Sequence, residues 1–139
     1  MNTRSAFCKL AGVGALVAAT LSCGPALAGE LSLSGANEVP PVQTSASGTG
    51  TITVGADGAV SGSIKTTGVA GTMAHIHAGA AGKNGPVIVP LTKAGDGWAV
   101  PAGAKLTSEQ MKSYQAGELY VNVHSDAHKG GEIRAQLTP

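Results

Sequence analysis

The residues best suited to chemistry are four histidines, which fall in two places along the chain. His75 and His77 form a His-x-His pair, and His124 and His128 follow much later in the sequence. Neutral imidazole is a good ligand for zinc, copper, iron and nickel. All four histidines are therefore candidate metal ligands, with copper as the leading metal and zinc as the alternative.

The elements that carry the histidines must be strands if the imidazoles are to meet. Residues i and i+2 of a strand point to the same face, so His75 and His77 project together while Ile76 turns away. The segment Tyr-Val-Asn-Val-His at 120–124 places its valines on one face and His124 on the other. If the valines and Ile76 face the core, three imidazoles lie on the outward, polar side of the sheet. The sequence leaves open whether the two strands are neighbours, and a pair of exposed polar histidines is the alternative.

Two further residues bear on the metal. Met73 shares the period-2 face of His75 and His77, and a thioether there would favour Cu(I). Filling a gap in the packing is the alternative role for this methionine. His128 lies in a loop just before Gly130, which leaves the direction of its imidazole open.

The N-terminus has the three parts of a secretory signal peptide. Arg4 and Lys9 supply positive charge, and an apolar stretch runs over residues 10–21. Small residues in the Ala-Leu-Ala segment at 26–28 then predict cleavage before Gly29. The apolar stretch is shorter than the roughly 20 residues needed to span a bilayer, so we expect no membrane span in the mature chain.

Cleavage divides the chain into a signal peptide, residues 1–28, and one domain, residues 29–139. Both cysteines, Cys8 and Cys23, leave with the signal peptide, so the mature chain has no disulfide and no thiolate ligand. We therefore expect a periplasmic or secreted protein that meets copper outside the cytosolic thiol pool. A retained anchor, or a lipoprotein site at Cys23, is the alternative.

Charge and motifs exclude several classes of function. The full chain has nine Lys and Arg residues against eight Asp and Glu residues, and loss of Arg4 and Lys9 leaves seven against eight. A net charge near −1 without a basic patch does not favour nucleic acid as a partner. Hydrolase and nucleotide chemistry are not favoured either, because Ser-His-Asp, Cys-His and phosphate-loop signatures are missing. Protein partners and oligomeric state stay open.

Composition and periodicity predict an all-β fold. Glycine and threonine are abundant and strong helix formers are few. Residues 31–34 alternate as a strand should, and runs at 50–54 and 60–64 flank an Asp-Gly turn, which indicates a hairpin. The remaining predicted strands are 73–78, 86–91 (apolar enough to be largely buried), 98–100, 118–124 and 132–137.

One segment breaks the strand pattern. Thr107 and Gln110 form a capping box, and Gly117 is a suitable stop, so the sequence predicts a helix from Ser108 to about Gln115. The whole pattern predicts an antiparallel Greek-key β-sandwich with one short helical connection.

The motifs resemble those of the chordin-domain (CHRD) family. The resemblance rests on Leu-Ser-Gly-Ala-Asn-Glu-Val-Pro-Pro-Val at 33–42, Ala-His-Ile-His at 74–77, residues 120–124, and Gly-Glu-Ile-Arg at 131–134. It implies an extracellular or periplasmic β-sandwich of about this length. The animal proteins that named the family bind growth factors through other modules, so that activity does not follow for a single domain.

The arrangement is also similar, more loosely, to copper–zinc superoxide dismutases. That similarity implies copper ligands at His75, His77 and His124, and an Arg134 that guides anions toward the metal. The bridging histidine, the zinc-site aspartate and the disulfide cysteines have no counterparts, so a zinc site of that type is not expected. Structural roles are the alternative for these motif residues. Glu132 and Arg134 would pair with other charges across the last strand, and residues 38–41 would direct the chain between strands.

Three functions follow from these observations. The leading hypothesis is an exported copper protein that serves copper binding, delivery or tolerance. This hypothesis favours a binding protein over an enzyme. The second is a structural or adhesive binding module without metal. The third is a redox enzyme that resembles a copper-only superoxide dismutase.

Overall fold

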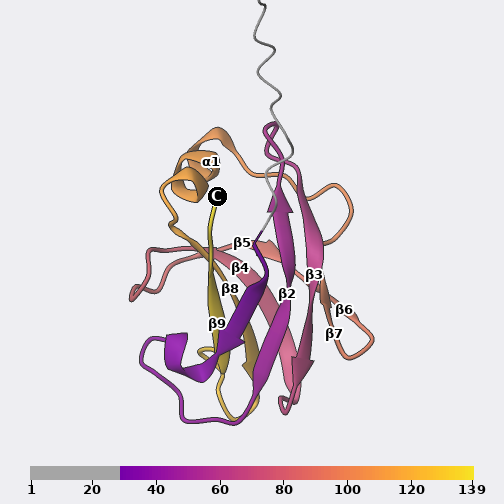
Figure 1. The fold of residues 1–139 in the computed structure, drawn as a ribbon, viewed down its shortest axis with the longest axis vertical. Helices are drawn as coiled ribbons and strands as arrows, with labels where there is room; N and C mark the ends of the chain where they lie inside the picture. Colours follow the sequence, from indigo (N-terminus) through magenta and orange to yellow (C-terminus); the bar gives the residue numbers. More distant parts are fainter. Residues whose placement is uncertain (1–28) are drawn as a thin grey trace, which may run out of the picture.

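The computed structural model describes residues 29–139, and the signal peptide predicted for residues 1–28 lies outside them. The described chain forms nine strands, a short 3-10 helix and one α-helix (Figure 1). The strands are β1 (Leu31–Ser34), β2 (Ser47–Val54), β3 (Val60–Thr67), β4 (Gly71–Ala78), β5 (Val87–Pro90), β6 (Thr92–Ala94), β7 (Gly97–Ala99), β8 (Leu119–Ser125) and β9 (Ile133–Leu137). The helices are η1 (Gly35–Asn37) and α1 (Ser108–Gln115).

All nine strands belong to one antiparallel sheet in the order β5-β4-β8-β9-β1-β2-β3-β7-β6. The two edge strands, β5 and β6, follow each other in the chain with only Leu91 between them, so the two edges of the sheet come together. The sheet therefore folds over on itself, with β2 and β3 in front of β4 and β8 in Figure 1. This arrangement confirms the predicted all-β antiparallel sandwich.

The core fills the space between the two layers. Ile76 of β4 and Val121 and Val123 of β8 are almost completely buried in it, as the alternation predicts. The residues between them on each strand consequently occupy the opposite face of the sheet. Other members of the core are Leu31, Leu33, Ile52, Ile64, Trp98, Leu119, Ile133 and Leu137.

The single α-helix begins and ends where the sequence predicts. The Thr107 side chain accepts a hydrogen bond from the Gln110 backbone, and the Gln110 side chain accepts one from the Thr107 backbone. Gly117 follows with a φ of 73°, a conformation that favours glycine. Neither this helix nor any other in residues 29–139 is long and apolar enough to cross a membrane.

Two strands differ from the prediction. The apolar segment around β5 was expected to be largely buried, but β5 is an edge strand and Val87 is 49% exposed. The sequence also gave no signal for β6, whose residues Thr92–Ala94 are all exposed. Its strand conformation comes from pairing with β7 rather than from its own composition.

The capping box provides a test of the helix. Replacing Thr107 with alanine removes the side-chain acceptor and should lower the free energy of unfolding by about 1 kcal/mol, within the usual range of about 0.5–2. Urea unfolding measures this change. Ser108→Ala, which truncates the neighbouring exposed hydroxyl, is the control, and equal effects of the two substitutions would contradict the capping role.

Candidate metal centre

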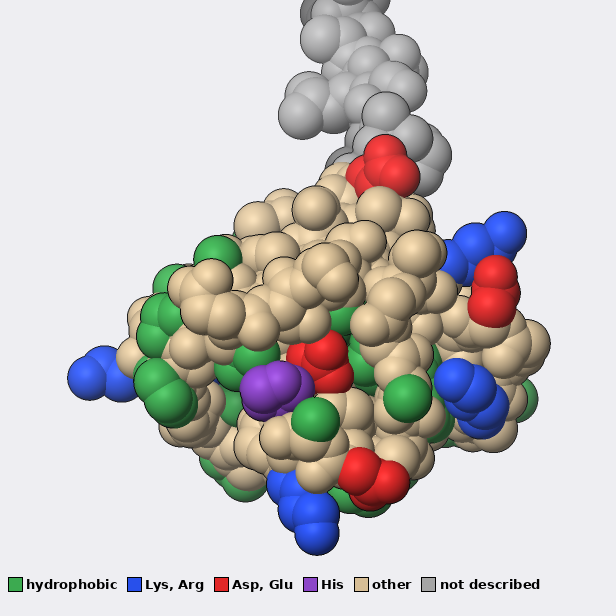
Figure 2. All heavy atoms as spheres, turned by 90° about the horizontal axis from the view of Figure 1, so that it is seen from below, with side chains coloured by type: hydrophobic (Ala, Val, Ile, Leu, Met, Phe, Trp, Pro, Cys, Tyr) green, Lys and Arg blue, Asp and Glu red, His purple; other side chains and the backbone are tan. Residues whose placement is uncertain are grey.

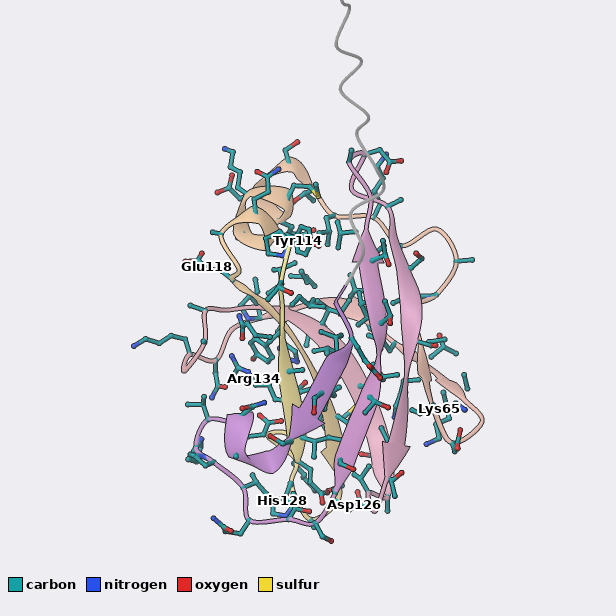
Figure 3. The ribbon with its side chains drawn as sticks, viewed as in Figure 1. Lys65, Tyr114, Glu118, Asp126, His128 and Arg134 are labelled. Carbon is teal, nitrogen blue, oxygen red and sulfur yellow. The ribbon has the colours of Figure 1, made fainter. Side chains whose placement is uncertain are left out.

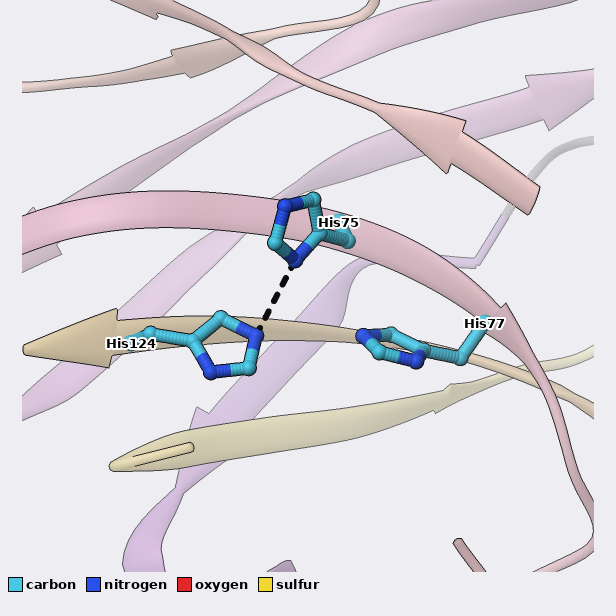
Figure 4. A group of neighbouring side chains, drawn as sticks. All are labelled: His75, His77 and His124. Carbon is cyan, nitrogen blue, oxygen red and sulfur yellow. Dashed lines mark hydrogen bonds between the residues drawn. The ribbon is translucent and has the colours of Figure 1, made fainter. Parts of the chain in front are cut away.

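The histidine strands are neighbours, which was the condition that the sequence left open. β4 and β8 pair antiparallel, with His75 opposite Asn122 and His77 opposite Tyr120. One ring nitrogen from each of His75, His77 and His124 lies within 4.8 Å of the others. Figure 4 shows the three imidazoles converging on the same side of these two strands.

Two backbone carbonyl groups fix the tautomers of two of these imidazoles. Nδ1 of His77 lies 2.9 Å from the carbonyl oxygen of Gly85, and Nδ1 of His124 lies 2.9 Å from that of Lys129. A carbonyl oxygen can only accept, so each Nδ1 carries the proton and each Nε2 keeps a free lone pair. Metal-binding histidines are oriented in the same way by an acceptor at the second nitrogen.

The third imidazole is held by another member of the group. Nδ1 of His75 lies 3.1 Å from Nε2 of His124 (Figure 4). Since Nδ1 of His124 already carries a proton, this contact is a hydrogen bond donated by His75. A metal ion at this point would replace the shared proton and bind both nitrogens.

The site is more buried than the predicted outward, polar face. His77 and His124 are each 7% exposed, and His75 is half-buried. The loops that carry Gly85 and Lys129 supply the covering contacts. Nε2 of His77 is buried without a hydrogen-bond partner, which costs about 1–3 kcal/mol. A metal ion would satisfy this nitrogen, so the donor set fits a metal.

The surroundings of His75 and His77 favour the neutral form of both imidazoles. Burial lowers the pKa of His75 below 6.5, and the neighbouring His124 and His77 lower it further. Burial also lowers the pKa of His77, although its hydrogen bond to Gly85 acts in the opposite direction. Imidazole must be neutral to bind a metal, so these two side chains are ready to bind at neutral pH.

An aromatic and cationic stack supports the buried end of the site. The Tyr120 ring lies parallel to that of His77, with centroids 4.7 Å apart, and the Arg134 guanidinium lies 3.4 Å from the Tyr120 centroid. The Tyr120 hydroxyl also accepts a hydrogen bond from the Gly85 backbone N–H. The stack therefore fixes both the ring of His77 and the loop whose carbonyl orients it.

Arg134 has a different role from the one predicted by the dismutase similarity. It is only 1% exposed, and it donates hydrogen bonds to the carbonyl oxygens of Ala80 and Lys83 in the β4–β5 loop. Figure 3 labels Arg134, which β9 carries, on the side of the sheet where the β4–β5 loop lies. A guanidinium buried and bonded in this way cannot guide anions from solvent, and instead it holds the loop against the sheet.

The predicted charge pairing on the last strand is also wrong. In the described residues neither Glu132 nor Arg134 takes part in an ion pair. Burial opposes ionisation of Glu132, but hydrogen bonds from Ser125 and Thr44 hold its pKa below the usual value. Glu132 therefore ties the β8–β9 loop to the segment before β2.

His128 is not part of the converging group. It lies in the β8–β9 loop, at the lower end of the molecule in Figure 3, where its backbone N–H donates to the Ser125 carbonyl oxygen. Met73, in contrast, is directly opposite His124 in the strand pairing and is 50% exposed.

Sequence reasoning missed Glu38 as a part of this region. It is 4% exposed, and burial raises the pKa of its carboxyl group to about 7, although the Asn122 side chain and Arg134 act against this shift. The sequence predicts only a chain-directing role for residues 38–41. The available signals were the place of Glu38 in the family motif at 33–42 and the Val-Pro-Pro segment that follows it directly.

Gly131 explains how Glu38 comes so close to the sheet. A Cβ at this position would collide with the side chains of Glu38 and Asn122, and its φ of 126° also favours glycine. Glu38 also lines a surface pocket of about 490 Å³ together with Arg134 and Gln136. None of the histidines lines this pocket.

Among the described residues, the end of the molecule that is seen in Figure 2 carries no cluster of basic side chains. Figure 2 shows this end with Lys and Arg side chains projecting singly around the rim rather than forming a patch. A histidine side chain lies next to an acidic side chain near the middle of the same face.

Comparison with known proteins gives one match. The family model for the CHRD domain matches residues 30–137, nearly all of the described chain. Searches of curated proteins and of solved structures found no match. The similarity to copper–zinc superoxide dismutases therefore gains no support from these comparisons.

The buried carboxyl group of Glu38 predicts a specific pH dependence of stability. Between pH 4.5 and about 7 the unfolded chain ionises this group while the folded protein keeps it protonated, so the wild type loses stability as pH rises. Glu38→Gln cannot ionise. The free energy of unfolding of this variant, relative to wild type, should increase across that window and level off above pH 7.

Chemical denaturation at several pH values measures the effect. Glu30→Gln, which alters an exposed glutamate in the same domain, is the matched control. A difference between Glu38→Gln and wild type that is constant from pH 4.5 to 8 would show that the pKa of Glu38 is the same in the folded and unfolded chain, and would contradict the raised pKa.

Proposed function

The chain belongs to the CHRD-domain family, and we propose that it is an exported copper-binding protein whose metal ligands are His75, His77 and His124. The observation that carries this proposal is the convergence of three ring nitrogens around a buried, unpaired Nε2 of His77. Such a protein would serve copper binding, delivery or tolerance outside the cytosol.

The donor set supports copper over other metals. Copper(II) binds nitrogen ligands more tightly than the other common divalent metals, including zinc. The converging group contains no carboxylate, which would suit magnesium, calcium or manganese instead. Zinc, which also accepts three histidines, is the alternative metal.

The second candidate function is a binding module that needs no metal. The family match favours it, because a CHRD domain suggests a small extracellular binding module. On this alternative the three histidines would be a hydrogen-bonded structural group. The dismutase-like enzyme loses its main argument, since Arg134 is buried and bonded to the protein.

Metal titration distinguishes these functions. The purified protein should bind one copper ion per chain, and His75→Ala/His77→Ala should weaken binding by more than the roughly 10- to 100-fold typical of changes around metal ligands. Cu(II), Cu(I) and Zn(II) are titrated in parallel by competition with chelators of known affinity. His128→Ala, which removes a histidine outside the group, should bind like wild type.

Thermal unfolding provides a second readout of the same binding. A ligand that binds only the folded state raises its stability, so saturating copper should raise the Tm of wild type and of His128→Ala but not of the double variant. Equal and weak binding by all three proteins, with a Tm that copper leaves unchanged, would reject the metal site and favour the binding module.

A further inference from the structure

Met73 occupies the solvent side of the histidine group. It is one of two large hydrophobic side chains found exposed in the described residues, and it is on the same face of β4 as His75 and His77. Exposure increases along that face, from 7% at His77, through the half-buried His75, to 50% at Met73. The methionine therefore lies at the open end of the site.

The strand register brings Met73 within reach of the ligands. It pairs directly with His124 across the β4–β8 ladder, and the Cβ atoms of such a pair are about 4.5–5.5 Å apart. The side chain is unbranched and has three rotatable bonds. Its thioether can therefore turn toward the ring nitrogens without any movement of the backbone.

We propose that Met73 is the fourth ligand of Cu(I) at this site, and that Cu(II) and Zn(II) are held by the histidines alone. This inference rests on the proposed function, because it requires the three-histidine site. Thioether sulfur is a soft ligand, of the kind that favours Cu(I). Residues 29–139 contain no cysteine, so methionine is their only source of a sulfur ligand.

The position of Met73 also indicates how Cu(I) would leave. The inner end of the site is closed by the stack of Tyr120 and Arg134 on His77. The exposed thioether is the ligand that a partner's own sulfur ligand could replace first. The site is therefore arranged for delivery of Cu(I) to an acceptor with thioether or thiolate groups.

Anaerobic affinity measurements test this inference. Met73→Leu keeps the size and apolar character of an exposed side chain, so its fold should be unchanged. Its Cu(I) affinity, measured by competition with a chromophoric chelator, should fall by at least roughly tenfold, the lower end for changes around metal ligands. Its Cu(II) and Zn(II) affinities should equal those of wild type. Met111→Leu, in helix α1, is the matched control and should retain wild-type affinity for all three ions.

Selenomethionine labelling tests the bond itself. In the Met111→Leu protein Met73 carries the only selenium within residues 29–139, and selenium K-edge absorption should show a copper neighbour after loading with Cu(I). The same signal should be absent from labelled Met73→Leu. A wild-type Cu(I) affinity of Met73→Leu, or no selenium–copper contact in Met111→Leu, would overturn the role of Met73.

The outcomes separate the two proposals. If His75→Ala/His77→Ala loses copper while Met73→Leu binds Cu(I) normally, the inference about Met73 fails and the histidine site stands. If the double histidine variant binds copper as tightly as wild type, the proposed function itself fails.

Discussion

The antiparallel pairing of β4 with β8 is the constraint on which both the core and the metal site depend. Its register buries Ile76, Val121 and Val123 between the two layers and brings His75 and His77 beside His124 on the opposite face. A shift of one residue in a strand would turn its whole set of side chains to the other face. The burial of these apolar side chains therefore holds the histidines in place.

Around this pair of strands, the loops determine the state of the imidazoles. The Gly85 and Lys129 carbonyl groups hold a proton on Nδ1 of His77 and His124, which leaves both Nε2 atoms unprotonated. Arg134 in turn holds the β4–β5 loop through its hydrogen bonds to Ala80 and Lys83. Groups that never touch the metal thus prepare the site for it, which is typical of metal centres in proteins.

The sequence predicts correctly which face of the sheet carries the histidines, because strand periodicity is a local property. The alternation at residues 75–77 and 120–124 places the imidazoles opposite the core side chains, and the helix at Ser108–Gln115 follows from its capping box. The family resemblance is confirmed by the match to residues 30–137. These features depend on short segments, each of which carries its own signal.

The remaining features depend on contacts between distant segments. Nothing local indicates that β4 pairs with β8, that loops cover His77, or that His128 lies outside the group. The dismutase similarity predicts a solvent-facing Arg134 that guides anions. Its stack on Tyr120 arises only when β8 and β9 pair, so no local pattern could reveal that Arg134 is buried. The carbonyl groups that orient the imidazoles belong to the backbone, so no residue type could reveal them.

The central claim is that copper binds to His75, His77 and His124, and copper K-edge absorption tests it most directly. The protein loaded with one equivalent of copper should show a first shell with three imidazole nitrogens. The shell should be the same in His128→Ala and should lose imidazole scattering in His75→Ala/His77→Ala. A shell of oxygen ligands, or one that the double substitution leaves unchanged, would contradict the account.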